Sequence, residues 1–458
     1  MDIDTGAPID TNSHFSVIFP LPYRCLFLVG VGILGWATNL QGLYFLGVDT
    51  GYALDLKRST GSDIGLETHA THNVPSYLHP ATLHKPIYRI FAVYSIFTFF
   101  SWVFFRFMSA GSAATIDSSK FIPSLTIIVI LLALISPWPL FHRHDRMTFL
   151  RASLRCLVPS LTQPIYFCDI ILADIFTSFA KVIGDFWLAA IILFSRSHLW
   201  QLPAEEGLVQ WVTPCLMSLP YTIRLRQCLA EYVTTKSRRS LWNALKYSTA
   251  FPVIFLSAAQ RSSPVEASAS PKEHPLFKIW VLSVLINSVY SFWWDVTNDW
   301  GLSLLKPSST NLKRKRSMPN IPANSHRLLA VPSTSEGIKL PPSPSPTDFD
   351  PSERQFAGLR PKLFFNDPMI YYMAIFINFI LRFTWSLKLS SHLHHIADLE
   401  AGVFIIEALE VLRRWIWVFI RVEWEIIKLG GSREAANPEE FEFLMREGTE
   451  TEHSDVST

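Results

Sequence analysis

The chain has 458 residues, of which 49% are hydrophobic, 14% are aromatic and only 17% are charged. A typical soluble domain carries about 25% charged residues, so the composition excludes an ordinary soluble protein, a wholly disordered chain and a collagen-like repeat. The formal net charge of +2 also excludes the strong positive field of a nucleic-acid-binding protein. The apolar residues form long blocks, and a helix crosses a bilayer with about 20 such residues. We therefore expect an all-α, polytopic transmembrane helical bundle.

The first apolar block follows residues 1–21, which contain neither a basic stretch nor a small-residue cleavage site. We expect no cleaved signal peptide, so that the first apolar segment acts as an anchor. Nine candidate spans lie near residues 22–46, 87–108, 121–141, 164–194, 207–230, 240–258, 276–295, 368–390 and 401–428. Glycines and Asn39 interrupt the region 22–56 and suggest a second, shorter crossing there. We therefore prefer ten spans with both termini in the cytoplasm.

Clusters of Lys and Arg in short loops indicate the cytoplasmic side of a membrane protein. Such clusters lie at 142–155, 236–239 and 313–316, and all three are predicted to be cytoplasmic. The loops 259–275 and 390–400 are then predicted to face the lumen or the exterior.

The apolar blocks and the charged loops divide the chain into four regions. They are a cytoplasmic N-terminal segment (1–21), N-terminal transmembrane helices (22–150), a second transmembrane region (151–428) and an acidic cytoplasmic tail (429–458). Within the second region, residues 306–360 are rich in Pro and Ser, which predicts a disordered cytoplasmic loop. Its basic run, 313–316, is interpreted as a topological anchor, with a localisation or partner motif as the alternative.

The cysteines and histidines do not indicate an enzyme. Five cysteines, which lack metal-binding spacing, are interpreted as buried thiols rather than a disulfide framework. They are Cys25, Cys156, Cys168, Cys215 and Cys228. His392, His394 and His395 could bind a metal, but the sequence supplies no matching ligand cluster. It also contains no hydrolase, nucleotide-binding or metalloprotease motif, so we expect neither catalysis nor a cofactor.

Ionisable residues recur inside five apolar segments, although each costs about 2.5–3.5 kcal/mol in a membrane helix. Their spacing of three or four residues aligns them as stripes along helix faces. The stripes comprise Asp174, Thr177, Ser178, Lys181 and Asp185; Asn243, Lys246 and Tyr247; Asn287, Ser291, Asp295 and Asp299; Asn378, Arg382 and Trp385; and Glu407, Glu410, Arg413, Arg414 and Arg421.

Two interpretations of these stripes stay open. The first is ion pairing for assembly, since Glu410 is spaced to pair with Arg413 or Arg414. The second is a shared hydrated cavity, because two adjacent arginines cannot both be hidden on one narrow helix face. A cavity that holds these arginines with Lys246 and Arg382 suits a compact anion, since arginine offers forked donors to phosphate or carboxylate oxygens. Acidic residues would weaken binding enough for the anion to leave.

Five stretches of the sequence resemble the EXS-domain family, which includes eukaryotic phosphate exporters and the fungal ER-retention-defective proteins of the Golgi. They are residues 151–179, 219–249, 290–302 (YSFWWDVTNDWGL), 371–390 and 409–425 (LEVLRRWIWVFIRVEWE). Longer members carry an N-terminal SPX domain, for which the roughly 20 residues before the first apolar block leave no room. The resemblance is therefore to the short, Golgi-located branch.

The resemblance implies a function and a set of residues. It implies export of inorganic phosphate, a by-product of glycosylation, from the Golgi lumen to the cytosol, together with retention of Golgi glycosyltransferases and of ER luminal proteins. The implied phosphate pathway comprises Asp174, Thr177, Arg224, Lys246, Asp295, Asp299, Arg382, Arg413 and Arg414. Thr177 stands where exporters often have Asn. Trp385 would act as a bulky gate, with helix or lipid packing as the alternative.

The expected partners are inorganic phosphate and membrane lipids, with Golgi glycosyltransferases or sorting adaptors as further candidates. Whether a second copy of the chain binds to form a homodimer stays open. The alternative function is a non-transporting scaffold or sorting receptor for Golgi enzymes, with the loop 306–360 and the acidic tail as docking sites.

Overall fold

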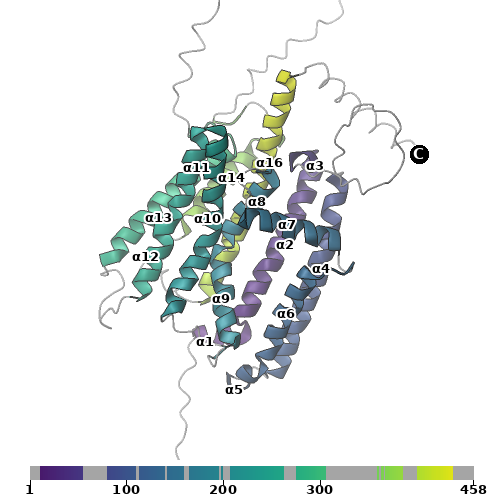
Figure 1. The fold of residues 1–458 in the computed structure, drawn as a ribbon, viewed down its shortest axis with the longest axis vertical. Coiled ribbons are helices and arrows are strands. Elements are labelled where there is room, and N and C mark those ends of the chain that lie inside the picture. The colour runs from purple at the N-terminus through teal and green to yellow at the C-terminus, as the bar shows by residue number, and fades with distance from the viewer. Residues whose placement is uncertain are drawn as a thin grey trace, which may run out of the picture.

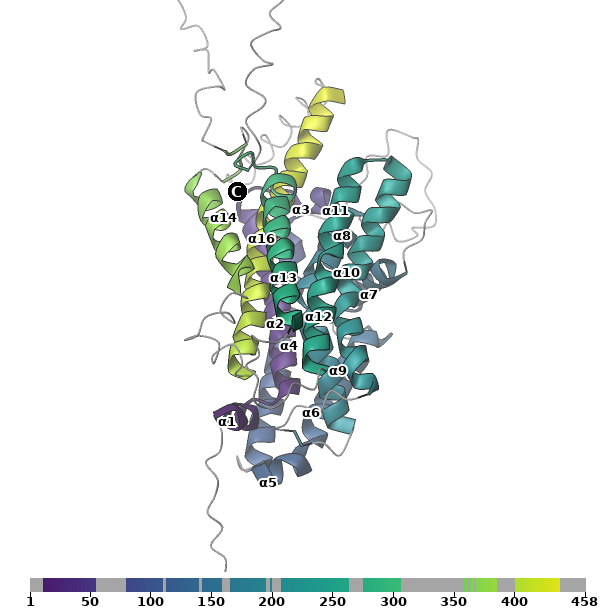
Figure 2. The ribbon, with the colours of Figure 1, turned by 90° about the vertical axis from the view of Figure 1, so that its left-hand side faces the viewer.

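The computed structural model describes most of the apolar part of the chain. The described residues are 11–54, 80–109, 113–139, 142–158, 165–194, 198–199, 207–262, 275–305, 358–360, 363–365, 367–384 and 400–436. All regular structure within them is helical, and the long helices lie side by side in one bundle (Figures 1 and 2). The predicted all-α fold is confirmed. Trp385, the three histidines at 392–395 and residues 306–357 and 437–458 lie outside the described residues.

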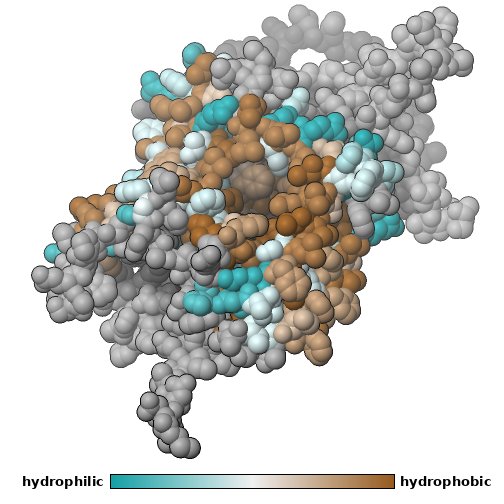
Figure 3. Space-filling model, turned by 60° about the horizontal axis from the view of Figure 1, so that its bottom comes forward, coloured by the Kyte–Doolittle hydropathy of each residue, from teal (hydrophilic) through white to brown (hydrophobic). Residues whose placement is uncertain are grey.

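Several helices are suited to cross a membrane. Four are long and apolar enough, namely Leu21–Phe45, Thr82–Met108, Asp117–Ile135 and Leu276–Asp299, and a bent pair of helices adds a fifth. Large side chains such as Phe100, Phe107, Leu132 and Ile135 are exposed, and the face drawn in Figure 3 carries a broad hydrophobic surface. A surface of this kind requires lipid rather than water around it. The protein is therefore a multi-pass membrane protein. The described helices include four or five that meet this criterion of length and composition, against ten predicted spans, and one of the ten is an error.

That error concerns the region 22–56. Residues Leu21–Phe45 form one uninterrupted helix, α2, and Gly47, with φ of +70°, ends it. The amide of Val48 donates to Leu43 O at 3.0 Å and that of Gly47 donates to Tyr44 O at 3.0 Å, which is the hydrogen-bond pattern of a glycine-terminated helix. Only the four-residue α3 (Thr50–Ala53) follows. The second crossing predicted there is wrong.

The N-terminal helices form a layer around α2. α1 (Thr11–Ile18) precedes it, and α4 (Pro80–Met108) packs antiparallel to it. The Tyr23 hydroxyl donates to Ser101 O at 3.2 Å at one end of this pair, and Tyr88 donates to Gln41 at 2.5 Å at the other. After the short α5 (Ala113–Ile116) and η1 (Asp117–Ser119), α6 (Phe121–Ile135) leads to α7 (Arg143–Leu157), which lies across the bundle in Figure 1.

The remaining helices complete the bundle. They are α8 (Phe167–Ser178), α9 (Ala180–Phe194), α10 (Leu208–Thr235), α11 (Arg238–Ser248), α12 (Ala250–Ser262), α13 (Pro275–Trp294), η3 (Asp295–Asp299), α14 (Met369–Arg382) and α16 (Glu400–Ala436). α16 contacts α2, α8 and α14, so it lies inside the bundle. Glycines on α2 allow the close packing, since a Cβ atom at Gly42 would lie 2.6 Å from Phe419 of α16. Small residues commonly permit such close approach between membrane helices.

The two ends of the described chain lie at opposite ends of the bundle (Figure 1). α1 packs against the start of α16, where the rings of Phe19 and Phe404 are 5.7 Å apart. α16, which is about 55 Å long, then runs parallel to α2, as the 2.9 Å hydrogen bond from Trp415 to Thr38 indicates. The prediction that both termini face the same side is therefore wrong for α1 and the end of α16.

The basic turn 236–239 lies at the same end of the bundle as the end of η3. Arg239 donates to the carbonyl of Asn298 at 2.8 Å, and the end of α16 extends beyond the same end (Figure 2). The turn and the end of α16 therefore lie at one end of the bundle, whereas the stretch 306–357 and residues 437–458 of the tail, which are predicted to share their side, lie outside the described residues.

Residues 358–360, which the sequence placed in a disordered loop, are instead packed against the bundle. The amide of Ser303 donates to Gly358 O at 2.9 Å, and Leu359 and Arg360 are buried. Arg360 Nη2 lies 2.6 Å from Glu423 Oε1 on α16. The two ends of the segment 306–357 are thus held together.

All five cysteines are unpaired. Cys25, Cys156 and Cys228 are buried as predicted, whereas Cys168 is half-buried and Cys215 is exposed.

Candidate functional site

Interrupted helices meet in the middle of the bundle. α8 and α9 are bent by 60° at a break around Phe179, α11 and α12 are separated at Thr249, and α13 continues into the π-helical η3. Backbone irregularities at membrane depth occur where protein or a water-filled cavity surrounds them, and they frequently mark binding sites. Charged side chains lie beside each of these three interruptions.

Asp295 lies at the centre of these charges and is fully buried. Its Oδ2 is 2.6 Å from Arg382 Nη2 and 3.7 Å from Arg413 Nη1, and its Oδ1 is 3.6 Å from Lys246 Nζ. Asn378 Nδ2 approaches Oδ2 at 3.4 Å. One carboxylate therefore faces three cations from three different helices.

The π-helical turn explains how the second aspartate reaches the same lysine. The amide of Trp300 donates to Asp295 O at 2.9 Å, a bond that spans five residues and gives a wider turn than an α-helix. Asp295 and Asp299 consequently both face Lys246, whose Nζ is 3.2 Å from Asp299 Oδ2. The indole of Trp294 donates to Asp299 Oδ1 at 3.2 Å.

A second buried pair joins α8 to α10. Arg224 Nε donates to Asp174 Oδ1 at 2.9 Å, and Arg224 Nη1 donates to Gln227 at 2.6 Å. The Tyr247 hydroxyl donates to the same carboxylate at 2.5 Å. All four side chains are buried, and Oδ1 of Asp174 accepts from both Arg224 and Tyr247.

The adjacent Arg413 and Arg414 point to different partners. Arg413 Nε donates to Glu410 at 2.8 Å. Arg414 instead donates to two hydroxyl groups at the α8–α9 break, from Nε to Ser178 at 2.9 Å and from Nη2 to Thr177 at 3.0 Å. Its guanidinium carbon lies 4.5 Å from the ring centre of Trp417.

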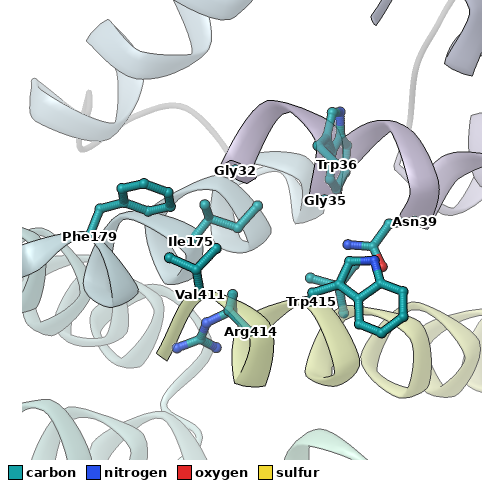
Figure 4. A pocket seen from close by; sticks show the side chains of 10 residues that line it. Gly32, Gly35, Trp36, Asn39, Ile175, Phe179, Val411, Arg414 and Trp415 are labelled. Carbon is teal, nitrogen blue, oxygen red and sulfur yellow. The ribbon is translucent and has the colours of Figure 1, made fainter. Parts of the chain in front are cut away.

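Arg414 also borders a small pocket between α2, α8 and α16. Figure 4 shows its side chain on α16 beside Val411, across from Gly32, Gly35 and Asn39 of α2. Among the described residues, no carboxylate lies within 4.0 Å of Arg414, and the buried Asn39 Oδ1 receives no hydrogen bond. The pocket therefore combines an arginine that lacks a carboxylate partner with an amide group.

We call this group the central cluster. It comprises Asp174, Arg224, Lys246, Asp295, Asp299, Arg382, Glu410, Arg413 and Arg414. Five cations thus face four carboxylates, which leaves one positive charge in excess. Within the described part of the chain, the buried Arg382 Nε and Arg413 Nη1 donate no hydrogen bond. The cluster can therefore offer charged donors to an oxyanion.

The structure brings all nine predicted pathway residues together. Asp174, Thr177, Arg224, Lys246, Asp295, Asp299, Arg413 and Arg414 are buried, and Arg382 is half-buried at the end of α14. Trp385, the predicted gate, lies outside the described residues. That these residues contact phosphate stays a prediction.

The sequence missed Gln227 and Trp294. Gln227 lies three residues after Arg224 on the same face of α10, and Trp294 directly precedes Asp295. The helical spacing of Gln227 could have been recognised, whereas the contact of Trp294 depends on the π-helical turn.

The helix break at Phe179 divides one predicted stripe. Asp174, Thr177 and Ser178 face the central cluster, whereas Lys181 and Asp185 face a separate group on α16. The sequence placed all five on one helix face because it did not reveal the 60° bend. In the described residues, no group of three or more His, Cys, Asp or Glu side chains is placed to hold a metal ion.

Comparison with known proteins identifies the family. A model of the EXS family matches residues 19–427. The chain belongs to the EXS family. The match takes in α2 to α7 as well as the region from residue 151 that carries the five motifs, so the N-terminal helices are also part of the family's sequence.

Individual relatives of this EXS-family protein are distant. The chain is 26% identical over 424 residues to Protein ERD1 homolog 2 of Schizosaccharomyces pombe, covering 88% of this chain and 95% of that protein. It is 28% identical over 276 residues to Protein ERD1 of Saccharomyces cerevisiae, covering 59% of each. It is 26% identical over 310 residues to Solute carrier family 53 member 1 of Homo sapiens, covering 64% of this chain and 37% of the human protein.

Proposed function

We propose that this EXS-family protein moves inorganic phosphate across the membrane through the central cluster. The excess positive charge of that cluster, with Arg414 lacking a carboxylate partner, is the observation that carries the proposal. A buried charge without a counter-ion is strongly unfavourable, so an anion that enters the cluster replaces the missing countercharge.

The arrangement of donors favours a tetrahedral oxyanion. The guanidinium groups of Arg382, Arg413 and Arg414 and the ammonium group of Lys246 come from three helices, which suits oxygens that point in different directions. Arginine binds phosphate oxygens through its planar fork and lysine acts as a point charge. The nearby carboxylates compete for the same donors, so a bound anion can leave again, as conduction requires.

The similarity to a human solute carrier supports transport as the class of activity. The similarity to ERD1 proteins, together with the resemblance to the short Golgi branch, supports the finer proposal. In it the protein resides in the Golgi membrane, exports luminal phosphate to the cytosol and supports the retention of glycosyltransferases and ER luminal proteins.

Phosphate flux in reconstituted vesicles tests the proposal. Replacing Arg414→Gln removes a charged donor from the phosphate pathway. A hydrogen bond to a charged group contributes about 1.5–3 kcal/mol, so we expect phosphate efflux to fall by about ten- to a hundredfold. Arg151→Gln is the matched control, because Arg151 is exposed on α7 and bonds within its own helix. Efflux of the Arg414→Gln protein at the rate of the control would contradict the proposal.

The scaffold alternative predicts a different outcome. Charge reversal at Arg413 would then leave vesicle flux unchanged while Golgi enzymes are missorted in cells. Loss of flux in correctly folded protein supports transport instead.

A further inference from the structure

A separate group of ionisable side chains lies near the start of α16. Lys181 of α9 forms an ion pair with Asp185, one turn further along the same helix, and its Nζ is 3.8 Å from Glu407 Oε1 of α16. Asp185 and Glu407 are both buried, with 4% and 8% of their surface exposed. One ammonium group therefore serves two buried carboxyl groups.

Among the described residues, the other ionisable groups around this pair add no further unpaired cation. From α2, Arg24 pairs with Glu400 of α16 at 2.7 Å. The buried thiol of Cys25, also on α2, lies within electrostatic reach of Asp185 and Glu407. From α4, Tyr94 donates to Leu26 O at 2.7 Å next to Cys25. We call Arg24, Lys181, Asp185, Glu400 and Glu407 the α9–α16 cluster. When all five are ionised, two cations face three carboxylates, and one negative charge is in excess.

The shared ammonium group shows where this excess lies. Lys181 Nζ pairs with Asp185 Oδ1 and lies 3.8 Å from Glu407 Oε1, so two buried carboxyl groups lie beside one positive charge. Two carboxylates that share a site do not both ionise readily, and a carboxylic acid can donate a hydrogen bond to a neighbouring carboxylate. Glu407 Oε1 is buried and, in the described residues, no N–H or O–H group donates to it. A single proton between the two groups satisfies both the geometry and the charge.

We propose that Asp185 and Glu407 share one proton and form a proton-binding site that controls phosphate movement through the central cluster. The second half of this statement rests on the function proposed above. Glu407 lies one turn before Glu410, the ion-pair partner of Arg413, and six residues, about 9 Å of helix, before Arg413. Charges at that distance inside a protein are only weakly screened.

The sign of the effect follows from the charges. With the proton bound, the α9–α16 cluster is neutral and does not oppose an anion beside Arg413. Once the proton leaves, the cluster carries one negative charge and repels the anion. Phosphate flux therefore falls as the pH at this end of the bundle rises through the range in which the pair releases its proton. The side chain of Lys181 is 41% exposed, so the pair is not sealed from the surface of the protein.

Infrared difference spectroscopy of the purified protein in lipid nanodiscs tests proton binding without phosphate transport. We expect a C=O stretching band of a protonated carboxyl group that disappears as the pH is raised. Glu407→Gln and Asp185→Asn each remove one carboxyl group and should each abolish the band, so the test survives if one variant fails to fold. Glu425→Gln is the control, because Glu425 lies on the same helix but pairs with both Arg421 and Lys428. A band that persists in both variants would overturn the proposal.

The pH dependence of phosphate efflux from vesicles tests the coupling. We expect wild-type flux to fall with rising pH on one side, and flux through Glu407→Gln, which is neutral at every pH, to lose that dependence. An unchanged pH profile in Glu407→Gln would overturn the coupling. If wild-type protein moves no phosphate, the proposed function fails, and the infrared titration still decides whether the proton site exists.

Discussion

The central cluster and the α9–α16 cluster are built from the same kinds of residue in the same membrane bundle, yet they carry opposite excess charge. The central cluster has one cation too many and is formed around arginines. The α9–α16 cluster has one carboxylate too many. α16 contributes to both, with Glu407 in one and Glu410, Arg413 and Arg414 in the other. The two clusters therefore differ in what would neutralise their excess charge. In our proposals an anion neutralises the central cluster, and a proton neutralises the α9–α16 cluster.

The difference lies in which residues can change their charge. Arginine stays protonated in proteins, so the central cluster cannot neutralise itself by losing a proton. Asp and Glu accept protons readily when they are buried. Removing a countercharge should therefore be much more damaging in the central cluster than in the α9–α16 cluster.

Asp295→Ala should have the largest effect. It removes the carboxylate that faces Lys246, Arg382 and Arg413 and leaves these three cations, two of them buried, without it. Breaking a buried ion pair typically costs about 3–5 kcal/mol, so we expect a strong loss of thermal stability, measured by the unfolding of purified protein in detergent. A variant as stable as wild type would mean that water already solvates these cations.

Lys181→Met should have a smaller effect that depends on pH. It removes the ammonium group between Asp185 and Glu407, but both carboxyl groups can then take up protons. We expect a loss of about 1–3 kcal/mol at neutral pH and a smaller loss at pH 5, measured by thermal unfolding at the two pH values. Equal destabilisation at both would indicate that packing rather than charge dominates at this position.

Thr177→Val should have the smallest effect. It removes one of the two hydroxyl groups that accept hydrogen bonds from Arg414 without changing any charge. Because Ser178 still accepts a hydrogen bond from Arg414, the net loss should be well below the about 1.5–3 kcal/mol typical of a hydrogen bond to a charged group. We expect phosphate flux to change by less than in Arg414→Gln while the pH profile stays that of wild type, measured in the same vesicles. A shifted pH profile would mean that the two clusters share one titrating group.

Much of the central cluster follows from helical spacing alone. The stripes on five segments selected Asp174, Lys246, Asp295, Arg382 and Arg414 without any contact information, because polar residues inside an apolar helix must face other polar groups. Spacing assumes a straight helix, however. The bend at Phe179 sends Asp174 and Asp185 to different clusters, and the π-helical turn aligns Asp295 with Asp299. Both deviations depend on tertiary packing, which a single sequence does not display.

The prediction for the N-terminus failed for a physical reason. Residues 1–21 contain no lysine or arginine, so the rule that positive loops stay in the cytoplasm gave no information there. The glycines in the first apolar segment suggested a break, but Gly42 lies against Phe419 of α16 and serves close packing. Only Gly47, with its positive φ, ends the helix.

Two contacts hold the ends of the segment 306–357 in place: the hydrogen bond between Ser303 and Gly358 and the Arg360–Glu423 ion pair. The stability of the bundle should therefore depend little on the number of residues in this segment. Because the entropy of closing a loop rises only slowly with its length, residues can be added or removed there with little loss of stability. A fluorescent protein inserted near residue 330 should therefore report on the location of the protein in cells while both charged clusters keep their geometry. Evolution has the same freedom at this position, so sequence length here can diverge between relatives without changing the residues that face the membrane interior.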